Sequence, residues 1–177
     1  MKSKFNGWSV FLMFTVASLI FVFSSRGETE TKTEVFPDDE IVFPENLLDA
    51  SGNLVSIDDL ESKYIGLYFS ASWCGPCRKF TPKLIDFRNK FSEEFEVILI
   101  GADGSAKAQA NYMKKYSMPW LAMENQSAQA KHASEVSGVE YIPYLVILDS
   151  KGNIITKDGK NHVMKMGEKA LEYWKDL

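Results

Sequence analysis

Short, unbroken apolar runs alternate along this chain with longer segments whose apolar residues recur at helical spacing. The runs Tyr64–Phe69 and Val97–Ile100 have the composition of strands that are buried on both faces of a parallel sheet. Between them, apolar residues from Phe80 to Phe91 recur every three or four positions, which predicts one face of a helix. A strand, a helix and a strand of these lengths form a βαβ unit with a right-handed crossover. The pattern therefore predicts an α/β domain built on a central sheet.

Further elements are predicted on both sides of this unit. Two β-hairpins are predicted, one from Asn46–Asp49 and Leu54–Ser56 and one from Tyr144–Leu148 and Asn153–Thr156. Helices are predicted after Ser105 as N-cap, over Ser127–Val136 with Gly138 as its C-terminal glycine, and over Val163–Trp174, with a short helical turn at Asp58–Glu61. The order of these elements predicts one domain over residues 41–177.

Residues 1–27 have the pattern of a targeting segment. Lys2 and Lys4 precede a mostly apolar stretch, residues 8–23, and small residues at 24–27 offer a peptidase site. As a helix with a rise of about 1.5 Å per residue, this stretch would span about 24 Å, less than a bilayer core of about 30 Å. The pattern favours a cleaved signal peptide over an uncleaved membrane anchor. Either way it predicts an exported domain that is periplasmic or otherwise extracytoplasmic, and that touches a membrane only through residues 8–23 if they are retained.

Composition and charge narrow the class of protein. Residues 28–40 are polar and acidic, rich in Thr and Glu, and are typical of a linker. The whole chain has 177 residues, of which 45% are hydrophobic and 25% charged, as in a globular domain. Without Lys2, Lys4 and Arg26 the 20 basic residues fall to 17 against 24 acidic ones, a net charge of −7. An acidic domain without a basic cluster argues against nucleic acid as a partner.

The only two cysteines, Cys74 and Cys77, lie where the first predicted strand passes into the helix. At a helix N-terminus the first N–H groups lack intrahelical partners, and the helix dipole favours a thiolate. The thiolate is the nucleophile in disulfide exchange, so this position activates Cys74. Gly75 and Pro76 suit the turn between the cysteines, because Gly is conformationally permissive and Pro has no N–H to leave unpaired in a first helical turn.

A CxxC pair can also be half of a zinc site. Two more ligands would then be needed, and His132 and His162 stand at spacings unlike those of a zinc ribbon or finger. We therefore expect no metal and no other cofactor, and both histidines are expected at the solvated surface.

The motif Trp73-Cys74-Gly75-Pro76-Cys77 resembles the active-site signature of the thioredoxin family. The surrounding sequence resembles the tryparedoxin and nucleoredoxin branch in four stretches: Tyr68–Trp73, Cys77–Pro82, Met118–Ala122 and Ile142–Val146. This resemblance covers roughly residues 41–177. It implies the thioredoxin-like fold, a central mixed β-sheet with helices on both faces, here preceded by an N-terminal β-hairpin.

The resemblance also implies a role for each residue of the motifs. Cys74 is the attacking and exposed cysteine, and Cys77 is the deeper, resolving one. The bond between Ile142 and Pro143 is cis, its loop faces the cysteines, and Ile142 offers backbone groups to a substrate. The residues expected to form the substrate-binding surface are Trp73, Gly75, Pro76, Ile142 and Pro143. Trp120 suits a core position better than a place in this surface.

One position departs from the thioredoxin pattern. Thioredoxins carry a buried aspartate six residues before the first cysteine, where it serves proton transfer to the second cysteine, and here that residue is Tyr68. The tryparedoxin-like branch also lacks an acid there. The substitution leaves open which base deprotonates Cys77.

These features predict a protein-disulfide reductase or electron relay, a thiol–disulfide oxidoreductase. Its partners are expected to be client proteins with disulfides or thiols and an unidentified redox partner, and the protein is expected to be a monomer. Two alternatives stay open. One is a membrane-tethered disulfide isomerase or client-binding module. The other is a thiol peroxidase, which the order of residues disfavours because Thr81 follows the cysteines instead of preceding one in a Thr-x-x-Cys motif.

Overall fold

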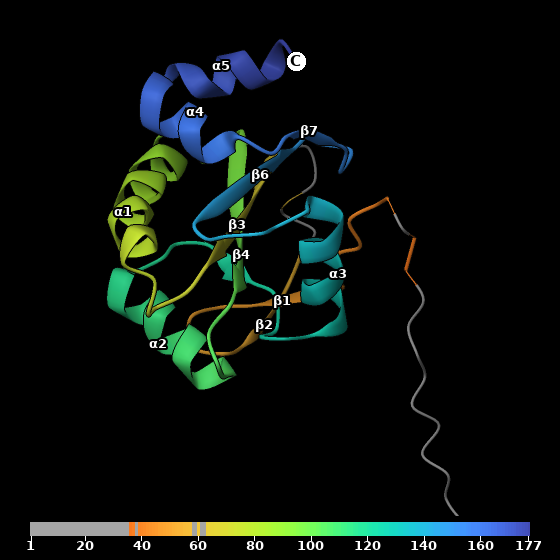
Figure 1. Ribbon diagram of the computed structural model, residues 1–177, viewed down its shortest axis with the longest axis vertical. Coiled ribbons are helices and arrows are strands. Elements are labelled where there is room, and N and C mark those ends of the chain that lie inside the picture. The colour runs from red at the N-terminus through yellow and green to blue at the C-terminus, as the bar shows by residue number, and fades with distance from the viewer. Residues whose placement is uncertain (1–35, 38, 58–59, 61–62) are drawn as a thin grey trace, which may run out of the picture. The chain divides into compact units, whose positions relative to one another are not determined.

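The computed structural model describes residues 36–37, 39–57, 60 and 63–177, and these form a mixed seven-stranded sheet with helices on both faces (Figure 1). The strands are β1 (Asn46–Leu48), β2 (Leu54–Ser56), β3 (Tyr64–Ser70), β4 (Phe95–Gly101), β5 (Leu121–Ala122), β6 (Tyr144–Leu148) and β7 (Ile154–Thr156). The helices are α1 (Gly75–Lys90), α2 (Ala106–Tyr116), α3 (Ala128–Ser137), α4 (Gly159–Met166) and α5 (Lys169–Lys175).

The strands lie in the order β2-β1-β5-β4-β3-β6-β7, with the predicted βαβ unit at the centre. β3 and β4 pair in parallel along their whole length, from Tyr64 opposite Phe95 to Ser70 opposite Gly101. β5 continues the parallel pairing on β4, whereas β6 runs antiparallel to β3. The parallel pairing therefore places the C-terminal ends of β3 and β4 side by side, at the end of the sheet where the cysteine loop begins.

Residues of the central strands alternate between two cores. Tyr68 points into the core beneath α1, α2, α4 and α5, whereas its neighbours Leu67 and Phe69 point into the core beneath α3. In the first core Phe87 of α1 makes edge-on contacts with Phe95 and Trp174, at ring-centre distances of 5.3 and 5.4 Å. Figure 1 shows α1 and α4 on one side of the strands and α3 on the other. These ring contacts fix α1 on the sheet.

Two loops with the same sequence pattern, Asp-x-x-Gly-Asn, close the β1–β2 and β6–β7 pairs. In each loop the aspartate carboxylate, Asp49 or Asp149, accepts hydrogen bonds from the backbone N–H groups two and four residues later. The fourth residue, Gly52 or Gly152, has a φ of 86° or 88°, which favours glycine. The sequence predicts both turns, and the shared aspartate explains why they have the same form.

The helix boundaries agree with the pattern except at the C-terminal end. Ser105 caps α2 by accepting a hydrogen bond from the N–H of Ala108, and Gly138 ends α3 in the left-handed region, as predicted. The single helix predicted over Val163–Trp174 is instead two helices. Gly167, at φ 55°, separates α4 from α5 and turns the chain so that Trp174 reaches the core.

Several predicted segments lie outside the described residues. They are the targeting segment 1–27, most of the linker 28–40, and the helical turn at 58–61 apart from Leu60. Within the described part of the chain, no helix is both long and apolar enough to cross a membrane.

The prediction that both histidines are solvated is wrong. His132 is 8% exposed, its Nε2 lies 2.8 Å from the carbonyl oxygen of Glu40, and its ring stacks on Phe36. His162 is half-buried, and its Nδ1 accepts a hydrogen bond of 3.0 Å from the indole N–H of Trp174. The ring of His132 holds together two segments that are far apart in the sequence, whereas the ring of His162 joins α4 to the neighbouring helix α5. The local pattern reveals neither contact.

Candidate active site

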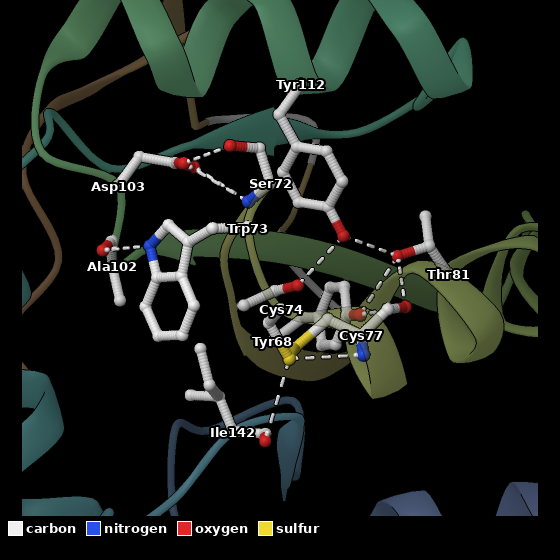
Figure 2. Close-up of a disulfide and its surroundings, with 11 residues drawn as sticks. Tyr68, Ser72, Trp73, Cys74, Cys77, Thr81, Ala102, Asp103, Tyr112 and Ile142 are labelled. Carbon is white, nitrogen blue, oxygen red and sulfur yellow. Dashed lines mark hydrogen bonds between the residues drawn. A yellow bond between two sulfur atoms is a disulfide. The ribbon is translucent and has the colours of Figure 1, made fainter.

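The two cysteines form a disulfide at the start of α1, shown in Figure 2. Cys74 is the N-cap residue, and its Sγ accepts a hydrogen bond of 3.2 Å from the backbone N–H of Cys77. Their Cα atoms lie 5.2 Å apart. The sulfur of Cys74 therefore occupies the place that a Ser or Asp oxygen takes in an ordinary N-cap, where an N–H donor and the positive end of the helix favour negative charge.

Burial distinguishes the two sulfurs less sharply than expected. Cys77 is completely buried, as predicted, but Cys74 is only 6% exposed. The prediction that Cys74 is exposed is thus wrong for the disulfide form, because Ala71 and the side chain of Ile142 pack around the pair. A client can reach the remaining edge of Cys74 and none of Cys77.

The predicted proline loop lies against the disulfide. The bond between Ile142 and Pro143 is cis, and the carbonyl oxygen of Ile142 lies 3.7 Å from Sγ of Cys74 (Figure 2). In the disulfide this sulfur has no proton, so the approach is a contact, and a reduced thiol at the same place could donate to the oxygen. The substrate-binding roles of Ile142 and Pro143 stay predictions.

The two tryptophans near the motifs have opposite environments. Trp73, next to the attacking cysteine, is 64% exposed, and its indole N–H donates to the carbonyl oxygen of Ala102 at 3.3 Å. Trp120 is 2% exposed and makes an edge-on contact with the ring of Tyr68 in the core, as the sequence favours. Only Trp73 therefore presents a flat apolar surface beside the disulfide, and its place in a substrate-binding surface stays a prediction.

Asp103, to which the sequence pattern assigns no role, holds the active-site loop. This buried carboxylate accepts hydrogen bonds from the hydroxyl of Ser72 at 2.6 Å and from the backbone N–H of Ser72 at 3.1 Å. Its own carbonyl oxygen accepts from the side-chain amide of Asn125 at 3.0 Å. Hydrogen bonds to a charged acceptor are among the stronger ones in proteins. Asp103 therefore fixes Ser72, the residue that precedes Trp73. In the sequence, the only sign of this role is that Asp103 comes just after a strand that is predicted to be parallel to the one before the cysteines.

A network of four hydroxyl groups lies beneath Cys77. The Tyr68 hydroxyl lies 3.0 Å from that of Thr81, which lies 2.8 Å from the hydroxyl of Tyr112, and Tyr112 in turn lies 3.0 Å from Ser70. Thr81 also donates to the carbonyl oxygen of Cys77 at 2.9 Å. Uncharged hydroxyl groups thus occupy the region where thioredoxins place an acid.

Burial raises the pKa of Tyr68 well above its usual value of 10.0, so its phenol stays neutral at physiological pH. A neutral phenol is a poor base. Tyr68 therefore orders the backbone around Cys77 and is not the base that deprotonates it.

The described residues around the disulfide include no group of side chains placed to hold a metal. The two cysteines are bonded to each other, and among the described residues no group of three or more His, Cys, Asp and Glu side chains is placed to hold an ion. What the site can do chemically is exchange its disulfide for two thiols.

Comparison with known proteins assigns the family. A family profile described as thioredoxin-like matches residues 61–154, more than half of the chain. Tryparedoxin from Trypanosoma brucei brucei is 39% identical over 133 residues, which cover 73% of this chain and 90% of tryparedoxin. The chain belongs to the thioredoxin-like family. Within it the relatives include tryparedoxins and nucleoredoxins, the branch that the motifs resemble.

Two further relatives support this thioredoxin-like assignment. Nucleoredoxin from Xenopus laevis is 32% identical over 181 aligned positions, which cover 92% of this chain and 43% of the nucleoredoxin. A solved structure of tryparedoxin from Trypanosoma brucei superimposes with a TM-score of 0.65 at 36% identity, over 78% of this chain and 94% of that one. The chain spans less than half the length of the nucleoredoxins that it matches.

The Tyr68 network leads to a prediction about stability and pH. In a Tyr68→Phe variant of this thioredoxin-like protein, Thr81 loses a hydrogen-bond partner, and the free energy of unfolding at pH 7 should fall by about 1 kcal/mol. Because the pKa of Tyr68 is raised in the folded state, the folded protein keeps a proton that the unfolded chain loses above about pH 10. The stabilisation is therefore complete below pH 10 and is lost as the pH rises further.

Urea unfolding at pH 7, 10 and 11 measures this difference. We expect the advantage of the wild type over Tyr68→Phe to shrink by about 1.4 kcal/mol per pH unit above pH 10. Tyr173→Phe removes an exposed hydroxyl and serves as the control, with a change at pH 7 within about 0.5 kcal/mol. An advantage that stays constant from pH 7 to 11 would contradict a buried, neutral Tyr68.

Proposed function

We propose that this protein is an exported protein-disulfide reductase or electron relay, which reduces disulfides of client proteins with its own pair of thiols. The observation that carries the proposal is the position of the disulfide at the N-cap of α1. There Cys74 keeps an accessible edge, while Cys77 is buried and one helical turn away. This is the arrangement that a two-step exchange needs, in which one sulfur meets the client and the other only its neighbour.

In the first step the thiolate of Cys74 attacks one sulfur of the client disulfide. A bond forms between Cys74 and that sulfur, and the client's other sulfur leaves as a thiolate. The N–H of Cys77, which lies 3.2 Å from Sγ of Cys74, is aimed at the sulfur that carries the negative charge before attack. This hydrogen bond favours the thiolate and thereby the nucleophile.

In the second step Cys77 resolves the mixed disulfide. Its thiolate attacks Sγ of Cys74, the Cys74–Cys77 disulfide forms, and the client's second sulfur leaves. The client gains two electrons and two protons in total, and the protein loses them. Because the cycle oxidises the protein, a second thiol donor must reduce the disulfide before the next turnover.

The first test separates a relay from a client trap. Reduced wild-type protein should reduce insulin with turnover when dithiothreitol regenerates it, whereas Cys74→Ser should have only the background rate of dithiothreitol. Cys77→Ser keeps the nucleophile but loses the resolving thiol. After pre-reduction and removal of dithiothreitol, it should therefore accumulate a covalent adduct with the client that added reducing agent dissolves. Turnover by Cys77→Ser equal to that of the wild type would contradict the two-step mechanism.

The direction of exchange depends on the redox midpoint of the pair. Arg78 and Lys79, the charges next to the motif, are both exposed, where solvent and salt weaken their effect on the thiolate. Proteins with this motif share the position at a helix N-terminus, so this position does not explain differences in redox midpoint between them. The remaining distinctive feature is the Gly75-Pro76 pair, which resembles that of reducing thioredoxins.

We therefore expect a midpoint of about −220 to −280 mV. Titration in glutathione and dithiothreitol buffers, with thiol alkylation as the readout, measures it. A value above about −170 mV would make the protein an oxidant or an isomerase instead of a reductant.

The export part of the proposal rests on the sequence of residues 1–27. The two lysines, the apolar stretch and the small residues after it favour a cleaved signal peptide. We expect the mature chain to begin between Ser25 and Glu28 and to be soluble without detergent. Intact-mass analysis of the protein from its native host tests this, and a full-length mass in the membrane fraction would show an uncleaved anchor.

A further inference from the structure

A groove with a distinctive charge opens beside the disulfide, between α1 and α4. The end nearest the disulfide is formed by Pro76, which stands between the two cysteines in the sequence, and by Pro143 of the cis-proline loop. From there it runs along α1 past Lys79 and Lys83, with Lys160 on the facing side. A chain that lies in this groove is therefore led to the sulfur of Cys74.

The floor of the groove is apolar and adaptable. Phe80 and Pro143 are buried beneath it, and Met164 of α4 lines it with 48% of its surface exposed. The unbranched, polarisable side chain of a methionine adjusts to different apolar partners. The floor thus suits an apolar side chain without requiring one particular shape.

The rim of the groove is positively charged, although the protein as a whole is acidic. Three lysines line it, and no acidic residue of the described part of the chain does; Asp86 lies farther along α1 and lines a neighbouring hollow. Within the described residues, none of these three ammonium groups has a carboxylate within 4 Å, whereas Lys90 and Lys175 are paired with Glu168 and Glu94. The rim lysines are therefore available to a ligand.

We propose that this groove binds an extended segment of the client protein in which acidic residues and an apolar residue flank the cysteine under attack. The inference rests on the proposed reductase function, since the segment must bring a disulfide to Cys74. Its carboxylates would meet the rim lysines, and its apolar side chain would lie on Met164 and Phe80. A polyanion such as nucleic acid fits less well, because the net charge of the chain is −4 and such a ligand carries no sulfur to the site.

The test compares three synthetic peptides of equal length that share one intramolecular disulfide. Two Glu, two Gln or two Lys residues flank the reactive cysteine, and a common Leu follows it. Pre-reduced protein is mixed with each peptide in a single-turnover experiment, which is quenched with acid and analysed by chromatography. We expect the Glu peptide to react about tenfold faster than the Lys peptide at low salt. The preference should weaken at 0.5 M salt.

A charge-reversal variant locates the preference. In Lys79→Glu/Lys83→Glu/Lys160→Glu the order of the peptides should invert, with the Lys peptide reacting faster than the Glu peptide. A matched variant, Lys114→Glu/Lys151→Glu/Lys169→Glu, makes the same change in net charge at exposed lysines outside the groove and should keep the wild-type preference. Lys83→Gln alone, which only removes one exposed charge, should reduce the Glu-to-Lys rate ratio by about twofold.

The outcomes separate the groove from the function. A wild type that reduces all three peptides at equal rates, or a Glu preference that persists in both the groove triple variant and Lys83→Gln, would overturn the groove proposal and leave the reductase intact. Equal loss of the preference in both triple variants would show an effect of net charge alone and would also overturn it. A wild type that reduces none of the peptides, and no insulin, would overturn the proposed function itself.

Discussion

The structure depends on one hydrogen-bonded position, the N-cap of α1, which a sulfur fills in place of an oxygen. Sγ of Cys74 accepts a hydrogen bond from the backbone N–H of Cys77. The same sulfur therefore caps the helix that follows the loop from β3 and forms the reactive disulfide bond. A group that caps a helix is held where N–H donors and the helix dipole favour negative charge. Local structure and reactivity therefore have a single cause, and the rest of the fold keeps this one junction in place.

The two cores and the loops around the site share that task. Rings from α1, β4 and α5 fix the helix on the sheet through Phe87, Phe95 and Trp174. Asp103 fixes the loop on the other side of the cysteines through Ser72. With both flanks fixed, the disulfide meets the carbonyl oxygen of Ile142, and the adjacent residues Pro76 and Pro143 line the lysine-rimmed groove. The site therefore exposes only a small part of Cys74. This part lies between the apolar surface of Trp73 and the basic groove.

Uncharged groups surround the buried cysteine. Where thioredoxins have an acid, Tyr68, Thr81 and Tyr112 form a network that holds no charge, because burial keeps the phenol of Tyr68 protonated. A buried carboxylate would be costly to ionise in such surroundings, and hydroxyl groups avoid that cost because they can both donate and accept. The network stabilises the start of α1 around Cys77 through hydrogen bonds between uncharged groups.

The sequence by itself determined the features that depend on neighbours along the chain. Strand and helix periods predict the β3–α1–β4 unit, and Asp-x-x-Gly-Asn predicts both hairpin turns. The CxxC motif is predicted at the start of the helix because a strand pattern precedes it and a helix pattern follows it. Tertiary structure alone decided how distant segments meet. Asp103, which follows β4, bonds Ser72, which follows the neighbouring strand β3. The ring of His132 meets the carbonyl oxygen of Glu40, and Lys160 of α4 joins Lys79 of α1 in one groove. The physical reason is that periodicity records which face of an element is buried, whereas the partner across that face is chosen by the packing of the whole sheet and its helices.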